Sequence, residues 1–519
     1  MVKIKYAGTI FLLVLCILLV KVRPNELGIF NVYDEGDSFD CNPSCDELGM
    51  YAPMAKKAAQ GHFGDPYIKE DADKIAVVMP QLFSLAIVSS LVKFFGLDIT
   101  YVILFLIFGF FNMFLIFLFL NKLVKNERAA LVGTIVMALF FNVITFIAYL
   151  PKLHVLGTLF RWDLVIFRFW NLMIPFTFLM LSLFLLKKLI FDDISIQKKI
   201  CYTLLVAMNF YFYIYTWTLI LAALGVLCVF VAAFKIWKLL KKIVLIGFSL
   251  VVLGLPQIII LFIKRSSFPN IERFLLVSGF HLPNLLLILF CLIILFILIR
   301  FFDAESTFFF KTETSYYFLA LVFATAALVL SNINLIIPFP QPHHYNYYLH
   351  LFGSMVVFTT LYHHLKEKPI FKYAAVLFPL LVISLFSINV VYELNLDSHL
   401  EQGEYYSIYL DNLDGLEGEQ ILLTKDLKMN MLIPSKTDHF VFIPNAFHFQ
   451  GSFNETLERL YVLESFYNIT IPINERNRWN MYLFHVDDYG NIYKGAPFIK
   501  PNRTTITPTK DYIFDYGLQ

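Results

Sequence analysis

The sequence predicts a polytopic all-α membrane protein with about 11 transmembrane helices and a small C-terminal α/β domain outside the membrane. Two observations predict the helices. Of the 519 residues, 59% are hydrophobic and only 15% are charged, whereas soluble domains have about 25% charged residues. Apolar runs of about 20 residues, each able to cross roughly 30 Å of hydrocarbon, also recur along the chain. A third observation, the polar C-terminal tail, predicts the separate domain.

The first apolar run, 6–20, follows Lys3 and Lys5. No small-residue cleavage site precedes Lys21, so we interpret the run as an uncleaved first span. The other predicted spans are 99–121, 129–150, 165–186, 200–216, 217–234, 243–263, 275–299, 317–337, 347–364 and 373–392. With this set, the lysine-rich loops fall on the cytoplasmic face, as the positive-inside rule requires. The N-terminus is therefore predicted inside and the tail outside.

One further segment, 75–95, is apolar enough to be another span. If it crossed the membrane, the lysine-rich loops downstream would face outward. Pro80 and Lys93 also weaken it as a crossing. We predict a juxtamembrane or re-entrant helix on the outer face. The chain then divides into a transmembrane domain, 1–392, which includes a first outer loop at 23–98, and an outer domain, 393–519.

The tail from Glu393 onward carries 18 acidic and 10 basic residues. Its pattern predicts strands at 420–424 and 439–443. Ser452 and Glu455 form a capping box that opens a helix through Phe466. A hairpin is predicted over 479–493. The sequons at Asn454, Asn468 and Asn502 agree with an outward tail.

Soluble-enzyme motifs are absent from the sequence. It contains no phosphate-binding loop, dinucleotide fingerprint, His-Glu-x-x-His or Gly-x-Ser-x-Gly. The missing nucleotide loop argues against an ATP-driven pump and favours an activated donor that arrives from the membrane. No basic stripe interleaved with aromatic residues is present, which excludes nucleic acid as a partner.

Two cysteines, Cys41 and Cys45, lie in the predicted outer loop. An oxidising exterior would allow a local disulfide between them, and free thiols are the alternative. Two thiols without clustered partners supply only half of a metal ligand set. We therefore expect a disulfide more than a metal site there.

The segment that follows Asp46 and Glu47 has the spacing of an amphipathic helix. Positions 48, 51, 52, 55 and 59 share one helical face. We expect this helix to lie along the outer membrane surface. Asp46 at its start suits a general base that acts on a lipid-borne substrate. Helix capping alone also explains an aspartate there.

The Asp46-Glu47 pair, Tyr51 four residues after the glutamate and the Ala-rich helix resemble the first outer loop of GT-C glycosyltransferases. The similar branch contains the protein O-mannosyltransferases and the lipid A aminoarabinose transferases. The resemblance continues through 78–83 and 93–96 and covers about 46–130. Asp34-Glu35 is a rival pair, but no Tyr-Ala helix follows it. We therefore prefer Asp46 and Glu47 as the catalytic residues.

The resemblance implies inverting transfer of a sugar from a polyprenyl-phosphate donor to an acceptor on the outer face. A carboxylate would take the acceptor proton, and cationic or hydrogen-bonding groups would stabilise the phosphate leaving group. The substrate-binding candidates are Tyr51, Arg161, Arg168, His343, His344 and Tyr345. Arg168 lies inside a predicted span, where a charge is costly and typically functional, although snorkelling to the headgroups also explains it.

These residues identify no cofactor with certainty. A divalent metal is a candidate at His343 and His344, but adjacent residues rarely ligate one ion, so phosphate or sugar contact is the preferred role. The predicted partners are the lipid-linked donor, membrane lipid and an acceptor that is a protein, a lipid or a glycan. The predicted location is a multi-pass position in a prokaryotic plasma membrane rather than the endoplasmic reticulum.

Two other functions compete with the transferase. A transporter or lipid-linked sugar flippase would have charged or broken segments near the membrane centre. Pro256 and Pro283 do interrupt predicted spans, but most ionisable residues lie at span ends. An O-antigen polymerase or ligase would place functional arginines in a large loop between late spans, and the loop at 337–346 has no Lys or Arg.

Overall fold

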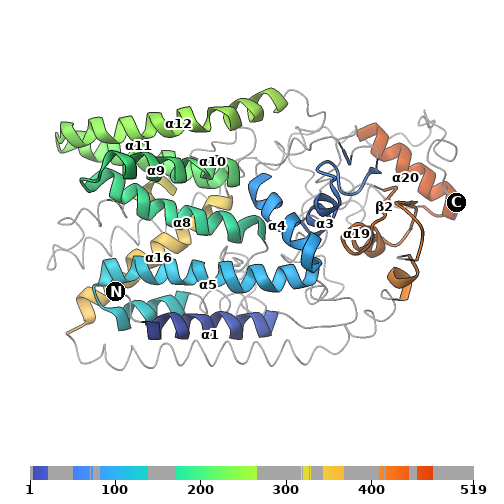
Figure 1. Cartoon of the computed structure of the whole chain (residues 1–519), viewed down its shortest axis with the longest axis horizontal. Coiled ribbons are helices and arrows are strands. Elements are labelled where there is room, and N and C mark those ends of the chain that lie inside the picture. The colour runs from blue at the N-terminus through green and yellow to red at the C-terminus, as the bar shows by residue number, and fades with distance from the viewer. Residues whose placement is uncertain are drawn as a thin grey trace. The chain divides into compact units, whose positions relative to one another are not determined.

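The computed structural model describes residues 4–21, 51–69, 72–73, 82–137, 170–265, 317, 320–325, 328, 343–367, 408–413, 415–443 and 453–470. Helices dominate this part of the chain (Figure 1). The chain forms two compact units. The helical unit comprises Met1–Val20, Leu104–Ile259 and Phe280–Leu396, and the loop–tail unit comprises Lys21–Ile103, Ile260–Gly279 and Asp397–Gln519.

The helical unit is built from apolar helices, several of which are long and run in the same general direction in Figure 1. They are α1 (Ile4–Lys21), most of α5 (Leu97–Val124), α8 (Trp170–Phe191), α9 (Ile196–Ala207), α10 (Asn209–Phe212), α11 (Ile214–Ala233), most of α12 (Trp237–Arg265) and α16 (His343–Leu365). Among the described residues, four helical stretches are long and apolar enough to cross a membrane: Leu97–Val124, Met173–Phe191, Ile214–Ala233 and Trp237–Ile260. The prediction of a mostly helical chain with apolar helices long enough to span a membrane is confirmed.

Several predicted spans coincide with helices. The expected runs 6–20, 99–121, 165–186, 243–263 and 347–364 correspond to α1, α5, α8, α12 and α16, with ends shifted by a few residues. The helices α8 and α12 continue through Pro175 and Pro256. The described part of the 129–150 run is helical over 127–137. The runs 275–299 and 373–392 lie outside the described residues, and the number of spans and their orientation stay predictions.

The predicted span 200–216 is not one helix, and its boundary with 217–234 was placed wrongly. The helix α9 ends at Ala207, and α10 adds only four residues. The backbone of Tyr213 is then extended, with φ −163° and ψ 135°, before α11 begins at Ile214. Hydropathy did not detect this interruption because the residues on both sides of it are apolar.

Polar side chains at the break explain the interruption. The Asn209 side-chain amide donates to Val206 O at 3.0 Å and to Ser182 Oγ at 2.6 Å. The Thr216 hydroxyl donates to Tyr213 O at 2.7 Å. Such local hydrogen bonds offer the backbone an alternative to a continuous helix. Non-helical backbone inside an apolar bundle is tolerated when protein groups satisfy it in this way.

A second polar contact joins α5 to α8 in the helical unit. The buried Asn112 amide donates to Met173 O at 3.1 Å, and the Thr177 hydroxyl donates to Asn112 Oδ1. Interhelical hydrogen bonds of this kind specify which helices pair when both surfaces are equally apolar.

The segment 75–95 forms a helix over part of its length. The helix α4 (Leu82–Phe95) has 14 residues and is roughly 21 Å long, less than the ~30 Å of a hydrocarbon core. It ends at Gly96, whose φ of 76° favours glycine, and α5 starts at Leu97. Residues 74–81 lie outside the described part of the chain, and the juxtamembrane placement of this segment stays a prediction.

The tail in the loop–tail unit contains a small βαβ arrangement. The strands β1 (Ile421–Leu422) and β2 (Phe440–Val441) pair in parallel, with Ile421 opposite Phe440. They confirm the strands predicted at 420–424 and 439–443. The helix α20 (Phe453–Tyr467) confirms the predicted helix. Ser452, the hairpin at 479–493 and Cys41 with Cys45 lie outside the described residues.

The connecting helix α19 (Leu427–Lys436) was missed by the sequence analysis. An aspartate, Asp426, precedes the helix in the sequence and is a typical N-cap residue. In the structure, Asp426 Oδ1 accepts a hydrogen bond from Met429 N at 3.2 Å. Leu432 and Ile433 are buried. Pro434 lies inside the helix and disguises its pattern. A parallel pair of strands requires such a crossover.

The helix α3 (Ala52–Gln60) forms where an amphipathic helix was predicted. Its small residues do not face outward, however, because Ala52 and Ala55 are fully buried and α3 packs on α4 and α19. The apolar face of α3 is therefore covered by protein. The outer loop groups with the tail in one compact unit, and the division into domains at residue 392 stays a prediction.

Candidate functional site

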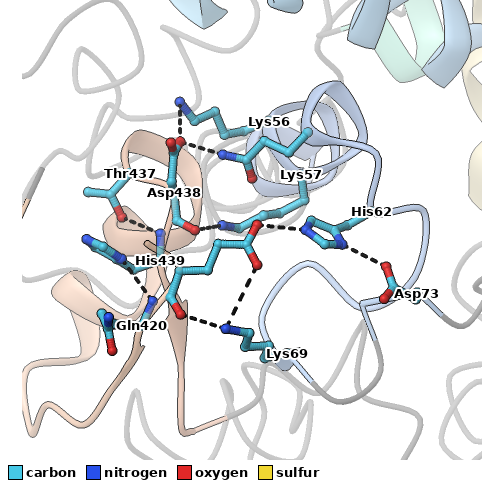
Figure 2. A network of polar contacts seen from close by, with 11 residues as sticks. Lys56, Lys57, His62, Lys69, Asp73, Gln420, Thr437, Asp438 and His439 are labelled. Atoms are coloured by element: carbon cyan, nitrogen blue, oxygen red, sulfur yellow. Dashed lines mark hydrogen bonds and ion pairs between the residues drawn. The ribbon is translucent and has the colours of Figure 1, made fainter. Parts of the chain in front are cut away.

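The best-defined polar site in the described residues joins the segment after the Asp46-Glu47 pair to the tail (Figure 2). It lies wholly within the loop–tail unit. The helix α3 supplies its first side chains. Pro53 lies in the first turn of this helix, where the missing N–H costs nothing. Gly61, with φ 104°, ends the helix and turns the chain towards His62.

Lys57 is the central residue of the site. Its side chain is fully buried, and Nζ donates to the backbone oxygen of Asp438 at 2.6 Å. The ammonium group also lies 4.0 Å from the centre of the Phe440 ring. Burial lowers the pKa of Lys57 from 10.5 to about 7, and the nearby carboxylates of Glu419 and Asp438 only partly oppose this. Lys57 therefore exchanges its proton near neutral pH.

The carboxylate of Asp438 contacts two side chains of α3. Lys56 Nζ lies 3.0 Å from Asp438 Oδ1, and the Gln60 amide donates to the same oxygen. Partial burial would raise the pKa of Asp438. The hydrogen bond from Lys56 and the positive charges nearby outweigh it, so the pKa is lowered. Asp438 therefore stays ionised and contacts α3 through both its side chain and its backbone.

His62 bridges two carboxylates. Its Nδ1 lies 2.8 Å from Asp73 Oδ1, and its Nε2 lies 2.8 Å from Glu419 Oε1. Both ring nitrogens donate only when the imidazole is protonated. Burial lowers the pKa of His62, but the hydrogen bonds to Asp73 and Glu419 raise it by more, so the net shift is upward. Both contacts therefore favour the protonated form of His62.

Backbone contacts continue the junction beyond the side chains. Val441 N of β2 donates to Tyr67 O at 3.0 Å. Asp65 Oδ1 accepts from Tyr67 N at 2.8 Å and so fixes the turn that carries this oxygen. Lys69 Nζ donates to Glu419 O at 2.6 Å. The loop thus makes one backbone hydrogen bond to β2 as well as side-chain contacts with the tail.

The start of β2 is held by His439. Its Nδ1 accepts from Gln420 N at 3.2 Å, and its Nε2 donates to Leu413 O at 2.7 Å. These two bonds require the neutral tautomer with the proton on Nε2. Thr437 Oγ1 accepts from His439 N at 3.1 Å. These bonds hold the residue after Asp438 to the segment before β1, and Asp438 O accepts from Lys57 next to it.

The arrangement can hold protons and carry charge, but it offers no metal ligand set. Within the described ranges, no three His, Cys, Asp or Glu side chains are grouped as ion ligands. Lys57 can exchange a proton near neutral pH, because its pKa is about 7. His62 can exchange one at a pH above the usual histidine range, because its pKa is raised. Its mechanical effect is to anchor α3.

Four of the eight predicted site residues, Asp46, Glu47, Arg161 and Arg168, fall outside the described part of the chain. Tyr51 is described: it is half-buried at the N-cap of α3 in the loop–tail unit. Tyr51 directly precedes the helix that carries Lys57. Its contact with substrate stays a prediction.

The predicted cluster at His343, His344 and Tyr345 opens α16 in the helical unit. For the two histidines only the helical backbone is described. Tyr345 is fully buried, and its hydroxyl is 2.7 Å from that of Thr218. Its ring meets Tyr215 edge-on, with centres 5.1 Å apart. The observed contacts of Tyr345 are those of a packing residue, and its contact with substrate stays a prediction.

Sequence reasoning missed Lys57, His62, Glu419 and Asp438 as a group. The sequence shows only two adjacent lysines, Lys56 and Lys57, inside an Ala-rich helix. Nothing in the spacing shows that residues more than 350 positions away return to bury one of them. The pairing is a product of tertiary structure alone.

No protein-family model, no curated protein and no solved structure matches this chain. The likeness to GT-C glycosyltransferases consequently depends on the residues of the first outer loop and on general architecture.

Proposed function

We propose that the chain is an integral-membrane glycosyltransferase. It would transfer a sugar, with inversion, from a polyprenyl-phosphate donor to an acceptor on the extracytoplasmic face. Asp46 would act as the general base, assisted by Glu47. The four long apolar helices support the membrane setting. The likeness of the first outer loop to GT-C enzymes supports the reaction.

The observation that carries the proposal is the anchoring of α3 directly after the carboxylate pair. Lys57 and His62 hold this helix to the tail through buried and bridging contacts. A general base is effective only when its position relative to the acceptor hydroxyl is fixed. A loop of about 80 residues that was anchored nowhere would not supply that precision.

The remaining residues have proposed roles in substrate binding. Arg161 and Arg168 would stabilise charge that develops on the leaving phosphate. Tyr51, His343, His344 and Tyr345 would contact sugar or phosphate, and a divalent metal is a candidate partner of the histidines. The proposed setting is the plasma membrane of a prokaryote, with the N-terminus inside and the tail outside.

The direct test is sugar transfer from labelled polyprenyl-phosphate monosaccharides by the purified full-length protein. Asp46→Asn should abolish transfer, whereas the matched variant Asp34→Asn should retain it. Full activity in folded Asp46→Asn would reduce Asp46 to a helix cap and point to Asp34 and Glu35. No turnover with any donor, from protein shown to be folded, would contradict the transferase.

A transporter or lipid-linked sugar flippase is the second candidate, and one observation favours it. The apolar segment 196–233 is broken at Met208 and Tyr213, with a buried Asn209 at the break. Transporters form their substrate sites from such discontinuous helices. Translocation of a fluorescent lipid-linked sugar by the protein in liposomes, without transfer to an acceptor, would favour this candidate over the transferase.

A further inference from the structure

The sequon Asn468-Ile469-Thr470 lies at the end of α20, and its threonine is more exposed than that of the other described sequon. Asn468 follows the helix directly, with φ 51° in the left-handed region that asparagine tolerates well. Ile469 N donates to Glu464 O at 3.0 Å and closes the helix end. Asn468 and Thr470 are both exposed. The amide and the hydroxyl of the Asn-Ile-Thr triplet are therefore both accessible.

The residue before this exposed triplet is hydrogen-bonded to the rest of the tail. The Tyr467 hydroxyl donates to Leu423 O at 2.8 Å and ties the end of α20 to the segment after β1. Lys425 Nζ lies 5.6 Å from the centre of the Tyr467 ring. The triplet thus projects from an ordered surface, and modification there would disturb no buried contact.

The second described sequon differs in one decisive respect. Asn454-Glu455-Thr456 lies in the first turns of α20, and Thr456 is only 1% exposed. A transferase that must engage both the asparagine and the hydroxyl two residues later finds the second group buried. In the folded chain the hydroxyl of this sequon is therefore inaccessible, whereas Asn468 is exposed.

We propose that Asn468 is an N-glycosylation acceptor. The donor class is a lipid-phosphate-linked glycan, used by a separate oligosaccharyl transferase of the host. Asn468 Nδ2 bonds to the anomeric carbon as the bond from that carbon to the lipid phosphate oxygen breaks. The electron pair leaves on the phosphate, and the amide proton passes to a carboxylate of the transferase. The assignment depends on the outward tail proposed above, but not on the activity of this chain.

Tryptic mass spectrometry of the full-length protein from native membranes tests the assignment. Cleavage after Lys436, Arg459 and Arg476 separates the two sequons into the peptides 437–459 and 460–476. We expect glycan on 460–476 and none on 437–459. Thr470→Ala should remove the glycan, while Thr470→Ser should retain it, because serine keeps the hydroxyl.

Modification of 437–459 in place of 460–476 would overturn the accessibility argument. To separate the site from the topology, Ser465→Cys on the exposed side of α20 is labelled in intact cells with an impermeant maleimide, against the unmodified chain as background. Labelling with 460–476 unmodified overturns the glycosylation site alone. Labelling only after permeabilisation overturns the site together with the outward tail.

Discussion

Lys57 Nζ lies 2.6 Å from the backbone oxygen of Asp438, although 381 positions separate the two residues in the chain. This contact ties the helix after the proposed catalytic carboxylates to the start of β2 in the tail. Because the acceptor is a backbone atom, its position is set by the strand and not by a rotamer. The tail is therefore a structural support for α3.

The first prediction concerns the proton on Lys57. Its pKa in the folded chain is about 7, against 10.5 ordinarily, so between these values the unfolded chain binds more protons. Stability of the junction must then rise with pH from about 7 towards 10. Hydrogen exchange of the peptide 52–60 should show increasing protection over this range relative to Lys57→Met at the same pH.

Lys56→Met is the matched control, because it removes the neighbouring amine and leaves Lys57 in place. It should keep the rise in protection. If wild-type protein and Lys57→Met gave parallel profiles, Lys57 would not be the titrating group.

The second prediction concerns His62, whose pKa is raised in the folded chain. A raised folded pKa gives stability that is full below about pH 6.5 and is lost as pH rises through the folded value. The effect is opposite in sign to that of Lys57 and begins at lower pH. Protection of the loop around His62 should therefore fall from about pH 6.5 upward, as measured by hydrogen exchange.

Removing one carboxylate at a time tests this bridge. Glu419 is 31% exposed and Asp73 is 84% exposed, so water screens Asp73 far more. We expect Glu419→Gln to weaken the pH-dependent fall much more than Asp73→Asn. An equal effect of the two variants would mean that burial does not decide the strength of the bridge.

The third prediction uses the covered face of α3. Ala55 is fully buried where α3 packs on α4 and α19, so Ala55→Leu should overpack this face and cost ~1–3 kcal/mol. Displacement of α3 should expose the bonds after Lys56 and Lys57 to trypsin. The neighbouring Ala59 is only half-buried, and Ala59→Leu should leave cleavage nearly unchanged. Similar cleavage in both variants would argue against packing of α3 on protein.

The fourth prediction concerns two glycines of α12. A methyl group at Gly254 would overlap the Phe210 ring beside the helix break, whereas one at Gly247 would meet Leu224 at an ordinary 3.8 Å. Gly254→Ala should therefore destabilise the detergent-solubilised protein by about 1–3 kcal/mol. Gly247→Ala should be neutral or slightly stabilising, because alanine favours the helix. Thermal unfolding of the two variants side by side measures the difference, and equal melting temperatures would refute the close packing at Gly254.

The sequence by itself determined which segments are apolar helices. Membrane spans depend on composition over a local window, and α1, α5, α8, α12 and α16 follow directly from it. The strands β1 and β2 and the helix α20 were equally local, since alternation and helical period are short-range patterns. Local patterns did not predict α19, because Pro434 interrupts its helical period. They also did not predict the break at Tyr213, because it lies between two apolar runs.

Tertiary structure alone decided the polar site. Whether Lys57 is a solvated surface lysine or a buried amine with a lowered pKa depends on what covers it. The cover is β2, with Phe440 and the Asp438 carbonyl, from the far end of the chain. The covered face of α3 and the pairing of His62 with Glu419 have the same origin. Burial and charge pairing are properties of distant segments brought together, and no local pattern of residues encodes them.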